Sequence, residues 1–446
     1  MTNLFIFRRD LRIQDNHALN AASSSNIMPI FIYNKTRQTN PKTNKYFSPS
    51  AYEFMNECLT DLFKNLPELR IYQATKSDLE ILKKILKKHP EIKAIYFNAD
   101  LASPFARSRD AEIAEWCKTN KLECHAITTD YTLVDPSTME KPYQKFTPFY
   151  NKYKDQVERK VATTTTSSIK FKPCALKSVQ LDSKSLNHRQ DAINVLKSIP
   201  KHFQHYNTTR DEMWKNTTHL SKYLKFGVVS IREAYLAAKN NEPLRREFFF
   251  RSFYDQVAYH FPRVIDSNSN SNSNSSFYIK YNNLKWSKNA SHLKAWTTGT
   301  TGFPLVDAAM CQLLTESYMH NRGRMLVASF LTKTLHIDWR IGERFFAQHL
   351  VDYHPSANNG GWQWAAGTGT DAQPYFRTFS PWLQSAKHDP DALYIKKYIP
   401  ELEQVPAKDI HKWSEKYIKY PECKYPRPIV DHTQETKKTM QIYKAI

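Results

Sequence analysis

The chain has 446 residues, with 64 lysines and arginines against 43 acidic residues, so its formal net charge is +21. This excess of positive charge indicates an anionic partner, either nucleic acid or an anionic membrane surface. No apolar run approaches the roughly 18 residues that a membrane span needs, and the amino terminus lacks a signal peptide's pattern. We therefore expect an intracellular protein, in cytoplasm or nucleus, that does not act at a membrane.

The length allows two or three domains, each with its own core. The six cysteines are scattered without a Cys-x-x-Cys pair, and the 16 histidines form no His-Glu-x-x-His pattern. This usage is typical of a reduced intracellular protein, and we expect neither structural zinc nor another metal.

Residues 1–132 alternate short apolar runs with amphipathic stretches. The expected strands cover residues 4–7, 27–33, 94–97 and the segment after Glu123. The expected helices cover 48–66, 77–88 and 104–120, and the first two open on serine caps. This alternation predicts an α/β domain with a doubly wound parallel sheet and a ligand crevice at the strand ends. No Gly-x-Gly-x-x-Gly follows the first strand, which leads into the polar run 8–16, so we do not expect an ordinary NAD site.

Residues 133–190 are polar and lysine-rich, and we interpret them as an interdomain linker. Residues 191–446 have apolar side chains at helical spacing and predict an all-α domain. Its clearest expected helices cover residues 228–239, 247–260, 303–314, 322–335 and 343–351. The alternating Ser-Asn run 267–276 is expected to be a disordered surface loop without a function.

Two clusters early in the helical half could carry chemistry. The first, residues 217–221 (Thr-Thr-His-Leu-Ser), is either a phosphate site at a helix start or a simple helix cap. The second, residues 247–254, repeats Glu247, Phe250, Arg251 and Tyr254 at helical spacing. An acid, an aromatic ring, a cation and a phenol could thus share one side, while the other phenylalanines are expected in the core.

A third cluster, residues 319–325, is rich in basic and amide side chains. Asn321 and Met325 lie one turn apart and should face the same way, whereas Arg322 and Arg324 should serve different partners. Cations at a helix start oppose the macrodipole, so an acid or an anionic ligand should lie nearby. Asp352 is a candidate partner for one of the two arginines.

The fourth cluster, residues 358–371, contains four of the nine glycines of the chain, two tryptophans and two asparagines. We expect these glycines where the backbone adopts positive φ or closely approaches another group. The mixture suits a flat aromatic ligand with polar edges. Trp362 and Trp364 are two residues apart, so their rings should leave the backbone on different sides.

Taken together, these stretches resemble the DNA photolyase/cryptochrome family, and most closely its class I cyclobutane pyrimidine dimer photolyases. The resemblance runs nearly end to end through residues 5–16, 301–310, 319–325 and 358–377. It implies an α/β amino-terminal domain and an all-α, FAD-binding catalytic domain. It also implies a deoxyribodipyrimidine photo-lyase, in which light drives an electron from reduced FAD to a flipped-out dimer in UV-damaged DNA and splits it. A monomer is expected.

Site residues follow from this resemblance one by one. The implied FAD contacts are Tyr206, Thr217, Thr218, Leu220, Ser221, Arg324, Asp352, His354 and Asn358, with Arg324 and Asp352 as an ion pair and Asn358 beside flavin N5. The implied electron-transfer chain, from flavin to surface, is Trp362, Trp339 and Trp286. The implied dimer and DNA contacts are Arg210, Glu247, Phe250, Asn321, Arg322, Met325, Trp364 and Arg377. Glu247 and Asn358 are the implied catalytic residues.

The chain departs from the family pattern at three positions. Phe250 stands where a tryptophan usually stacks on the dimer, and Ser252 replaces an acid. His354 replaces an aspartate that faces the flavin, and a neutral or cationic imidazole there would favour reduced anionic flavin. A second, antenna chromophore of unknown identity is expected, with residues 98–110 loosely resembling its pocket. A cryptochrome-type photoreceptor and repair of (6-4) photoproducts remain alternatives.

Overall fold

The computed structural model describes residues 2–34, 44–163, 169–179, 186–265, 274–372 and 374–446. The chain divides into two compact units, and each is described by itself. The first unit comprises Met1–Gln204, Thr218–Ile265 and Asp352–Ala357, and the second comprises His205–Thr217, Asp266–Val351 and Asn358–Ile446. Residues 267–273 of the Ser-Asn run and residues 164–168 and 180–185 of the expected linker lie outside the described residues.

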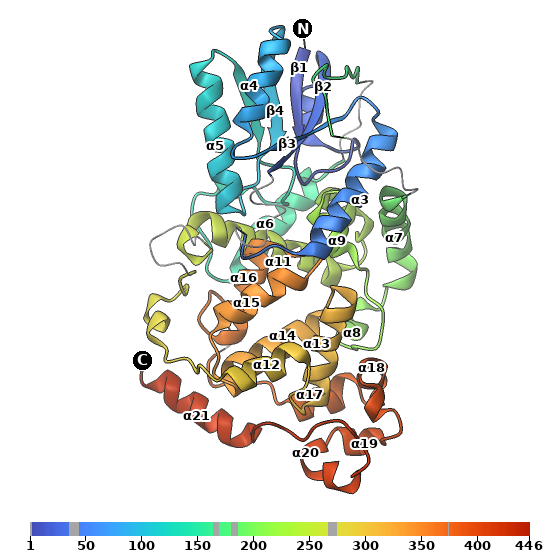
Figure 1. Cartoon of the computed structure of the whole chain (residues 1–446), viewed down its shortest axis with the longest axis vertical. Helices are drawn as coiled ribbons and strands as arrows, with labels where there is room; N and C mark the ends of the chain where they lie inside the picture. The colour runs from blue at the N-terminus through green and yellow to red at the C-terminus, as the bar shows by residue number, and fades with distance from the viewer. Residues whose placement is uncertain (1, 35–43, 164–168, 180–185, 266–273, 373) are drawn as a thin grey trace. The chain divides into compact units, whose positions relative to one another are not determined.

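A five-stranded parallel sheet forms the centre of the first unit (Figure 1). Its strands are β1 (Thr2–Phe7), β2 (Asn26–Asn34), β3 (Arg70–Ala74), β4 (Ile92–Asn98) and β5 (Glu123–Ile127). They lie in the order β3-β2-β1-β4-β5, and every neighbouring pair is parallel. This order confirms the predicted doubly wound sheet. Strand β3 was not predicted, because its five residues, Arg-Ile-Tyr-Gln-Ala, are too few and too polar to show a strand pattern.

Helices surround this sheet and continue into the later segments of the same unit. They are α1 (His17–Ala21), α3 (Pro49–Asn65), α4 (Leu79–Lys88), α5 (Pro104–Thr119), α6 (Phe146–Lys160), α7 (His188–His202), α9 (Leu220–Lys225), α10 (Ile231–Ala237) and α11 (Glu242–His260). The predicted serine cap of α3 is confirmed, since the Ser48 side chain accepts from the Ala51 N–H. Helix α4 begins two residues later than expected and has no side-chain cap at Asp78.

Helix α6 lies inside the segment that we interpreted as a linker. It buries Phe146, Phe149, Tyr150 and Val157 and packs against α11. The ring of Phe146 stacks on Phe250 of α11, with centroids 3.6 Å apart and an interplanar angle of 7°. The description of residues 133–190 as a linker over the surface is therefore wrong for α6. Its many lysines concealed an aromatic stripe at helical spacing.

The second unit is helical throughout its described residues, apart from loops and turns. Its helices are α8 (Tyr206–Thr209), α12 (Ala290–Thr298), α13 (Pro304–Glu316), α14 (Asn321–Ser329), α15 (Trp339–His349), α17 (Pro381–His388), α18 (Leu393–Tyr398), α19 (Ala407–Ile410), α20 (Trp413–Lys416) and α21 (His432–Lys444). Helix α16 (Pro355–Ala366) begins in the first unit and contributes most of its length to the second. The helix predicted over residues 322–335 is α14 followed by a π-helical segment, Phe330–Thr334.

The glycine-rich run 358–371 is largely helical, which corrects one expectation. Gly360 and Gly361 lie inside α16. Of the four glycines in this run, only Gly367 has a positive φ, +76°, and the one other positive φ, +48°, belongs to Asp371. Gly369 does closely approach a neighbour, because an added Cβ would lie 2.7 Å from the Cβ of Gln363. The asparagines and tryptophans before Gly367 sustain a helix that the two adjacent glycines had concealed.

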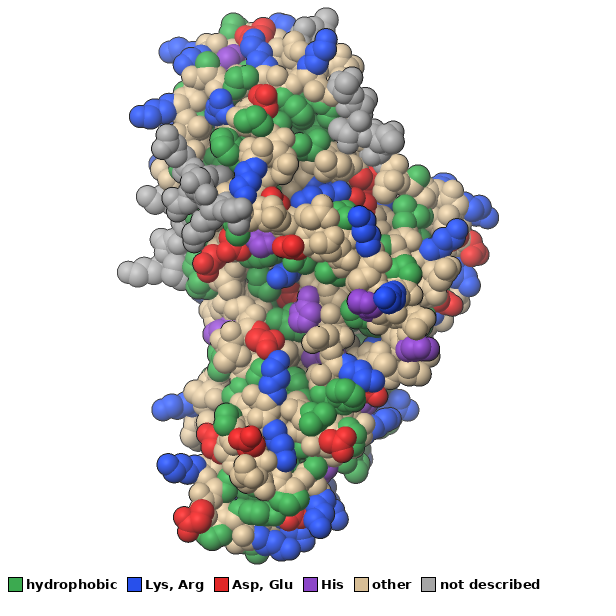
Figure 2. All heavy atoms as spheres, turned by 90° about the vertical axis from the view of Figure 1, so that its right-hand side faces the viewer, with side chains coloured by type: hydrophobic (Ala, Val, Ile, Leu, Met, Phe, Trp, Pro, Cys, Tyr) green, Lys and Arg blue, Asp and Glu red, His purple; other side chains and the backbone are tan. Residues whose placement is uncertain are grey.

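Basic side chains are spread over the face shown in Figure 2 and alternate with acidic ones. Among the described residues, no helix is both long and apolar enough to cross a membrane. The described residues also contain no group of three or more His, Cys, Asp or Glu side chains arranged to hold a metal ion.

Candidate functional site

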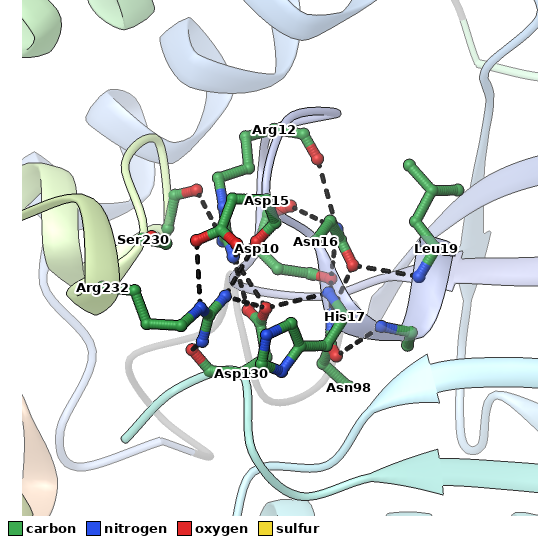
Figure 3. A network of polar contacts seen from close by, with 12 residues as sticks. Asp10, Arg12, Asp15, Asn16, His17, Leu19, Asn98, Asp130, Ser230 and Arg232 are labelled. Carbon is green, nitrogen blue, oxygen red and sulfur yellow. Dashed lines mark hydrogen bonds and ion pairs between the residues drawn. The ribbon is translucent and has the colours of Figure 1, made fainter. Parts of the chain in front are cut away.

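A buried polar network follows the carboxyl ends of β1 and β4 in the first unit (Figure 3). The Arg12 guanidinium donates to both carboxylate oxygens of Asp130, at 2.7 and 2.9 Å, and Arg232 of α10 donates to the same carboxylate at 3.0 Å. Asn98, the last residue of β4, donates to Asp10 at 2.6 Å. Burial alone would raise the pKa of Asp130, but the two guanidiniums lower it to about 2. These groups therefore satisfy one another.

A second charged cluster in the first unit contains Arg9, Lys225 and Arg251 together with the carboxylates that act on them, Asp100, Asp255 and Asp352. Arg9 pairs with Asp100 through two hydrogen bonds, at 2.6 and 3.0 Å. Lys225, the last residue of α9, has its pKa lowered to about 7 by burial and then by the charge of Arg9. The same two causes lower the pKa of Arg251 to about 10. Cations whose charged forms are disfavoured would be stabilised by an anionic ligand.

The predicted phosphate segment leads directly into this cluster. Leu220 and Ser221 are the first residues of α9, and the preceding His219 has a left-handed φ of +48°. Helix capping is weak here, because the Thr218 hydroxyl accepts from the Leu220 N–H at a long 3.4 Å and His219 makes no side-chain cap. Thr217 belongs to the second unit, where its hydroxyl lies 2.9 Å from that of Tyr318.

His354 lies in a buried hydrogen-bonded group centred on Asp255. Asp255 Oδ1 is 2.7 Å from His354 Nε2 and accepts from the Ser356 hydroxyl at 2.5 Å. Burial and then the charge of Arg251 lower the pKa of His354 to about 4, outweighing the attraction of Asp255. The imidazole is therefore neutral near pH 7, with its proton on Nε2, and the cationic form that the sequence left open is disfavoured. The buried Nδ1 has no hydrogen-bond partner among the described residues.

Helix α11 carries the other family departures. Phe250, expected to stack on a dimer, has one ring face covered by Phe146. Ser252 is fully buried, and its hydroxyl contacts the Thr132 hydroxyl at 3.0 Å and accepts from the Leu133 N–H at 3.1 Å. Ser252 therefore secures the chain after β5, and a longer acid would not fit these contacts. Glu247 lies one turn before Phe250 and is partly buried.

In the second unit, the Trp362 ring packs against Gly342, where any side chain would overlap the ring. A Cβ on Gly342 would lie 2.2 Å from Cη2 of Trp362. Trp339 precedes Gly342 by three residues on α15, so both lie on the same side of that helix. Trp362 and Trp339 are buried, whereas Trp286 is partly exposed in the segment before α12. Of these three tryptophans only Trp286, the expected outer end of the relay, is partly exposed, and the order of the relay stays a prediction.

Trp362 also contacts aromatic rings that the sequence did not suggest. The ring of Phe346 lies 5.0 Å away and that of Trp296 6.0 Å away, both in edge-to-face arrangements. Trp296 is fully buried, and its indole N–H donates to the Val327 carbonyl at 3.1 Å.

Asn358 and Gly361 lie one turn apart on α16. The Asn358 amide donates to the backbone carbonyl of Glu343 at 3.0 Å and contacts its carboxylate at 3.2 Å. At Gly361, an added Cβ would have no neighbouring atom within 4 Å. An oriented amide beside an open position on a helix is a surface that a flat ring could cover.

The cluster at the start of α14 divides as predicted. The Asn321 amide lies 3.7 Å from the Met325 sulfur, which confirms that the two face the same way. Arg322 pairs with Asp211 at 2.6 Å, while Arg324 donates to the Met319 carbonyl at 2.8 Å. The two arginines thus have different partners. The pairing of Arg324 with Asp352 stays a prediction.

Four predicted contact residues remain: Tyr206, Arg210, Trp364 and Arg377. Tyr206 begins α8 and Arg210 follows its last residue. Trp364 stacks on Phe379, with centroids 6.3 Å apart, so the two tryptophans of α16 have different neighbours, as expected. Arg377 is exposed and closes a turn by donating its N–H to the Pro374 carbonyl at 2.9 Å.

Sequence reasoning missed several residues of these groups. Asp255 gave no signal, because its partner His354 is 99 residues away. Lys225 and Gly342 did give a signal in the sequence. Lys225 is a lysine between two apolar residues, Leu224 and Phe226, and Gly342 is a lone glycine within a helical pattern. Both are exceptions to local preference, and such exceptions mark positions where tertiary contacts decide the residue.

Comparison with known proteins agrees with this arrangement. A family model described as DNA photolyase matches residues 3–167, and one described as the FAD binding domain of DNA photolyase matches residues 244–445. The chain is 34% identical to a deoxyribodipyrimidine photo-lyase of Alkalihalophilus pseudofirmus, covering 98% of this chain and 97% of that protein. It is 32% identical to the Escherichia coli protein of the same name, covering 100% and 98%.

The chain is also similar to solved structures of photolyases and a cryptochrome. An archaeal photolyase from Sulfolobus tokodaii, described as holding two FAD molecules, superimposes with a TM-score of 0.85 at 35% identity, and both chains are covered fully. A cryptochrome from Synechocystis, 23% identical over 99% of each chain, has a TM-score of 0.82 and shares the fold. The full-length relatives and the two family models show that the chain belongs to the DNA photolyase family.

Proposed function

We propose that this chain is a deoxyribodipyrimidine photo-lyase, which uses light to split cyclobutane pyrimidine dimers in UV-damaged DNA. Its relatives of this name are similar over nearly their whole length. The structural observation that carries the proposal is the face of α16, where the Asn358 amide lies one turn from the open position at Gly361.

The residues present fit FAD. Lys225 and Arg251 are partly buried cations with lowered pKa values, and an anion such as a pyrophosphate would stabilise their charged forms. Asn358 and Gly361 offer an amide and open space to a flat ring. When bound and reduced, the flavin supplies the light-excited electron that splits the dimer. The proposed contacts are Tyr206, Thr217, Thr218, Leu220, Ser221, Arg324, Asp352, His354 and Asn358.

The protein's own groups bind and orient the substrate. Basic side chains contact DNA phosphates, which gives a salt-sensitive affinity independent of sequence. Extrusion of a poorly stacked dimer costs a few kcal/mol. Glu247 hydrogen-bonds the extruded dimer, and Trp364 lies against it. The further proposed contacts with the dimer are Phe250, Asn321, Arg322 and Met325, and the proposed contacts with DNA are Arg210 and Arg377. Asp211 holds Arg322 in place before DNA binds.

Trp362, Trp339 and Trp286 form the proposed path along which electrons reach the protein interior. Gly342 supports this assignment, since it lets the Trp362 ring lie against the face of α15 that also carries Trp339. Indole rings give up an electron far more readily than phenyl or aliphatic side chains, and spaced rings divide a long transfer into short steps.

The finer organisation is also proposed. Residues 1–132 serve as an antenna-type domain, 133–190 connect it, and 191–446 form the catalytic domain. A second chromophore is proposed from the Sulfolobus tokodaii photolyase, which is described with two FAD molecules and a novel light-harvesting cofactor. The protein acts as a monomer inside the cell.

One experiment decides the main proposal. Purified protein is mixed with an oligonucleotide containing a thymine dimer, reduced, and illuminated with blue light while the absorbance of thymine is followed. Recovery of absorbance supports dimer repair. No recovery despite bound, reduced FAD favours a photoreceptor, and recovery only with a (6-4) substrate favours repair of that lesion instead.

A further inference from the structure

Lys333 is a lysine in an unusual place. It lies in the π-helical segment Phe330–Thr334, with only 1% of its surface exposed. No carboxylate among the described residues lies within 4 Å of its ammonium group, and burial alone lowers the pKa of Lys333 to about 8. A methionine would fill the same space without the cost of burying a charge. The ammonium group must therefore provide something that an apolar side chain cannot.

Its hydrogen bonds lead to one exposed turn. The ammonium donates to the Arg377 carbonyl at 3.0 Å and, more weakly, to the Pro374 carbonyl at 3.5 Å. The Pro374 carbonyl also accepts from the Arg377 N–H at 2.9 Å, which closes the turn Pro374–Arg377. One buried cation thus binds the carbonyls at both ends of a four-residue turn.

The same turn is attached at its inner side by an aromatic contact. Tyr375 stacks on Tyr443 of α21, with centroids 5.5 Å apart and planes 5° apart, and the buried Tyr443 hydroxyl donates to the Ala366 carbonyl. The next two side chains point outward: Phe376 is 54% exposed, and Arg377 is exposed. An exposed aromatic ring beside a cation, on a turn held from beneath, suits contact with a nucleic acid.

We propose that Lys333 is a positioning residue for DNA binding, which acts by holding the Pro374–Arg377 turn so that Arg377 reaches a DNA phosphate. The π-helical segment directs the Lys333 ammonium to the turn, while the Lys333 carbonyl accepts from the Thr439 hydroxyl of α21. This inference rests on the proposed role of Arg377 at DNA.

The test uses the full-length, FAD-bound protein and four variants: Lys333→Met, Lys333→Arg, Arg377→Ala and the double variant K333M/R377A. Hydrogen–deuterium exchange measures the turn without DNA, and titration with an undamaged duplex at several salt concentrations measures binding. We expect K333M to accelerate exchange in residues 375–379 and to weaken binding roughly tenfold, as R377A does. Each should reduce the slope of log K against log salt by about 0.9, the loss of one phosphate contact.

The double variant distinguishes positioning from general destabilisation. If Lys333 acts through Arg377, K333M/R377A binds DNA about as well as R377A alone, and K333R retains most of the affinity. Losses that multiply in the double variant, or unchanged exchange in the turn of K333M, would overturn the proposal. If R377A binds DNA normally, the proposed contact of Arg377 is itself wrong, and the exchange data, recorded without DNA, still report whether Lys333 holds the turn.

Thr439→Val is the matched control. It removes the hydroxyl that binds the Lys333 carbonyl and contacts His336 at 3.0 Å, but leaves the Lys333 ammonium intact. We expect a lower melting temperature with unchanged DNA affinity and salt slope. A loss of affinity in this control equal to that of K333M would assign the K333M effect to stability rather than to the turn, and would also overturn the proposal.

Discussion

His354 Nε2 lies 2.7 Å from Asp255 Oδ1, and this contact determines which nitrogen of the imidazole carries the proton. The carboxylate can only accept, so Nε2 donates and Nδ1 is left as an acceptor. The environment favours neutral His354, since burial and Arg251 lower its pKa to about 4.

The free energy of unfolding should decrease as the pH is lowered, because His354 is neutral in the folded protein. Its folded-state pKa of about 4 lies below the ordinary value of 6.5, so the unfolded chain takes up a proton first as the pH falls. The contribution of neutral His354 is complete above pH 6.5 and is lost towards pH 4, by roughly 3 kcal/mol. Urea unfolding between pH 4.5 and 7.5 measures this loss, and His354→Asn should show a shallower pH dependence. An equal slope in both proteins would contradict the prediction.

Replacing His354 by the aspartate usual in the family should destabilise the protein. In His354→Asp the new carboxylate would lie near the buried Asp255, and like charges at such a distance cannot both ionise cheaply. We expect a loss of about 3 kcal/mol, in the range found for uncompensated buried charges. The combined variant H354D/D255N should recover much of that loss, as measured by thermal unfolding. Equal stability of the single and double variants would show that the two side chains are not coupled.

Gly342→Ala should displace Trp362. Its Cβ would lie 2.2 Å from the Trp362 ring and 2.6 Å from Leu331 Cδ2, so we expect about 1–3 kcal/mol of destabilisation from overpacking. Photoreduction of the bound flavin should slow at least about tenfold. Absorbance under blue light with an external reductant measures the rate. Normal photoreduction in a folded G342A protein would argue against Trp362 as the first relay.

Gly361→Ala should stabilise the FAD-free protein, whereas Gly342→Ala should destabilise it. The added methyl meets no atom within 4 Å, and alanine stabilises a helix interior by about 0.5–1 kcal/mol relative to glycine. If the open space is where the flavin ring lies, FAD affinity falls at least about tenfold. Thermal unfolding without FAD and fluorescence titration with FAD separate the two effects. A more stable variant with unchanged FAD affinity would place the ring elsewhere.

Trp362→Phe should abolish photoreduction but preserve repair by chemically reduced enzyme, because a phenyl ring gives up an electron far less readily than indole. Trp296→Phe is the matched control, since the Trp296 ring also lies beside Trp362 but is not part of the predicted relay. We expect the control to photoreduce at a rate within about threefold of the unsubstituted protein. Unchanged photoreduction in W362F would refute the predicted relay.

Much of the fold was readable because its signals are local. Apolar runs and helical spacing predicted β1, β2, β4, α3, α4 and α5, since burial and capping act within a few residues. The five-residue helix α1 was not predicted. The contacts at the start of α14 were also readable, because residues one helical turn apart must face the same way. Strand β3 and helix α6 were missed where polar residues diluted the same local patterns.

The sequence by itself determined the family, the helical catalytic half and the candidate residues, because long motifs and helical spacing survive without coordinates. Only the tertiary structure decided which partners these residues contact and how deeply they are buried. It paired His354 with Asp255, enclosed the Lys333 ammonium under an exposed turn, and placed Trp362 against Gly342. These contacts join residues that are distant in the chain, so no local pattern reveals them. Their effect on stability and pKa depends on burial, because burial raises the free-energy cost of a charged group.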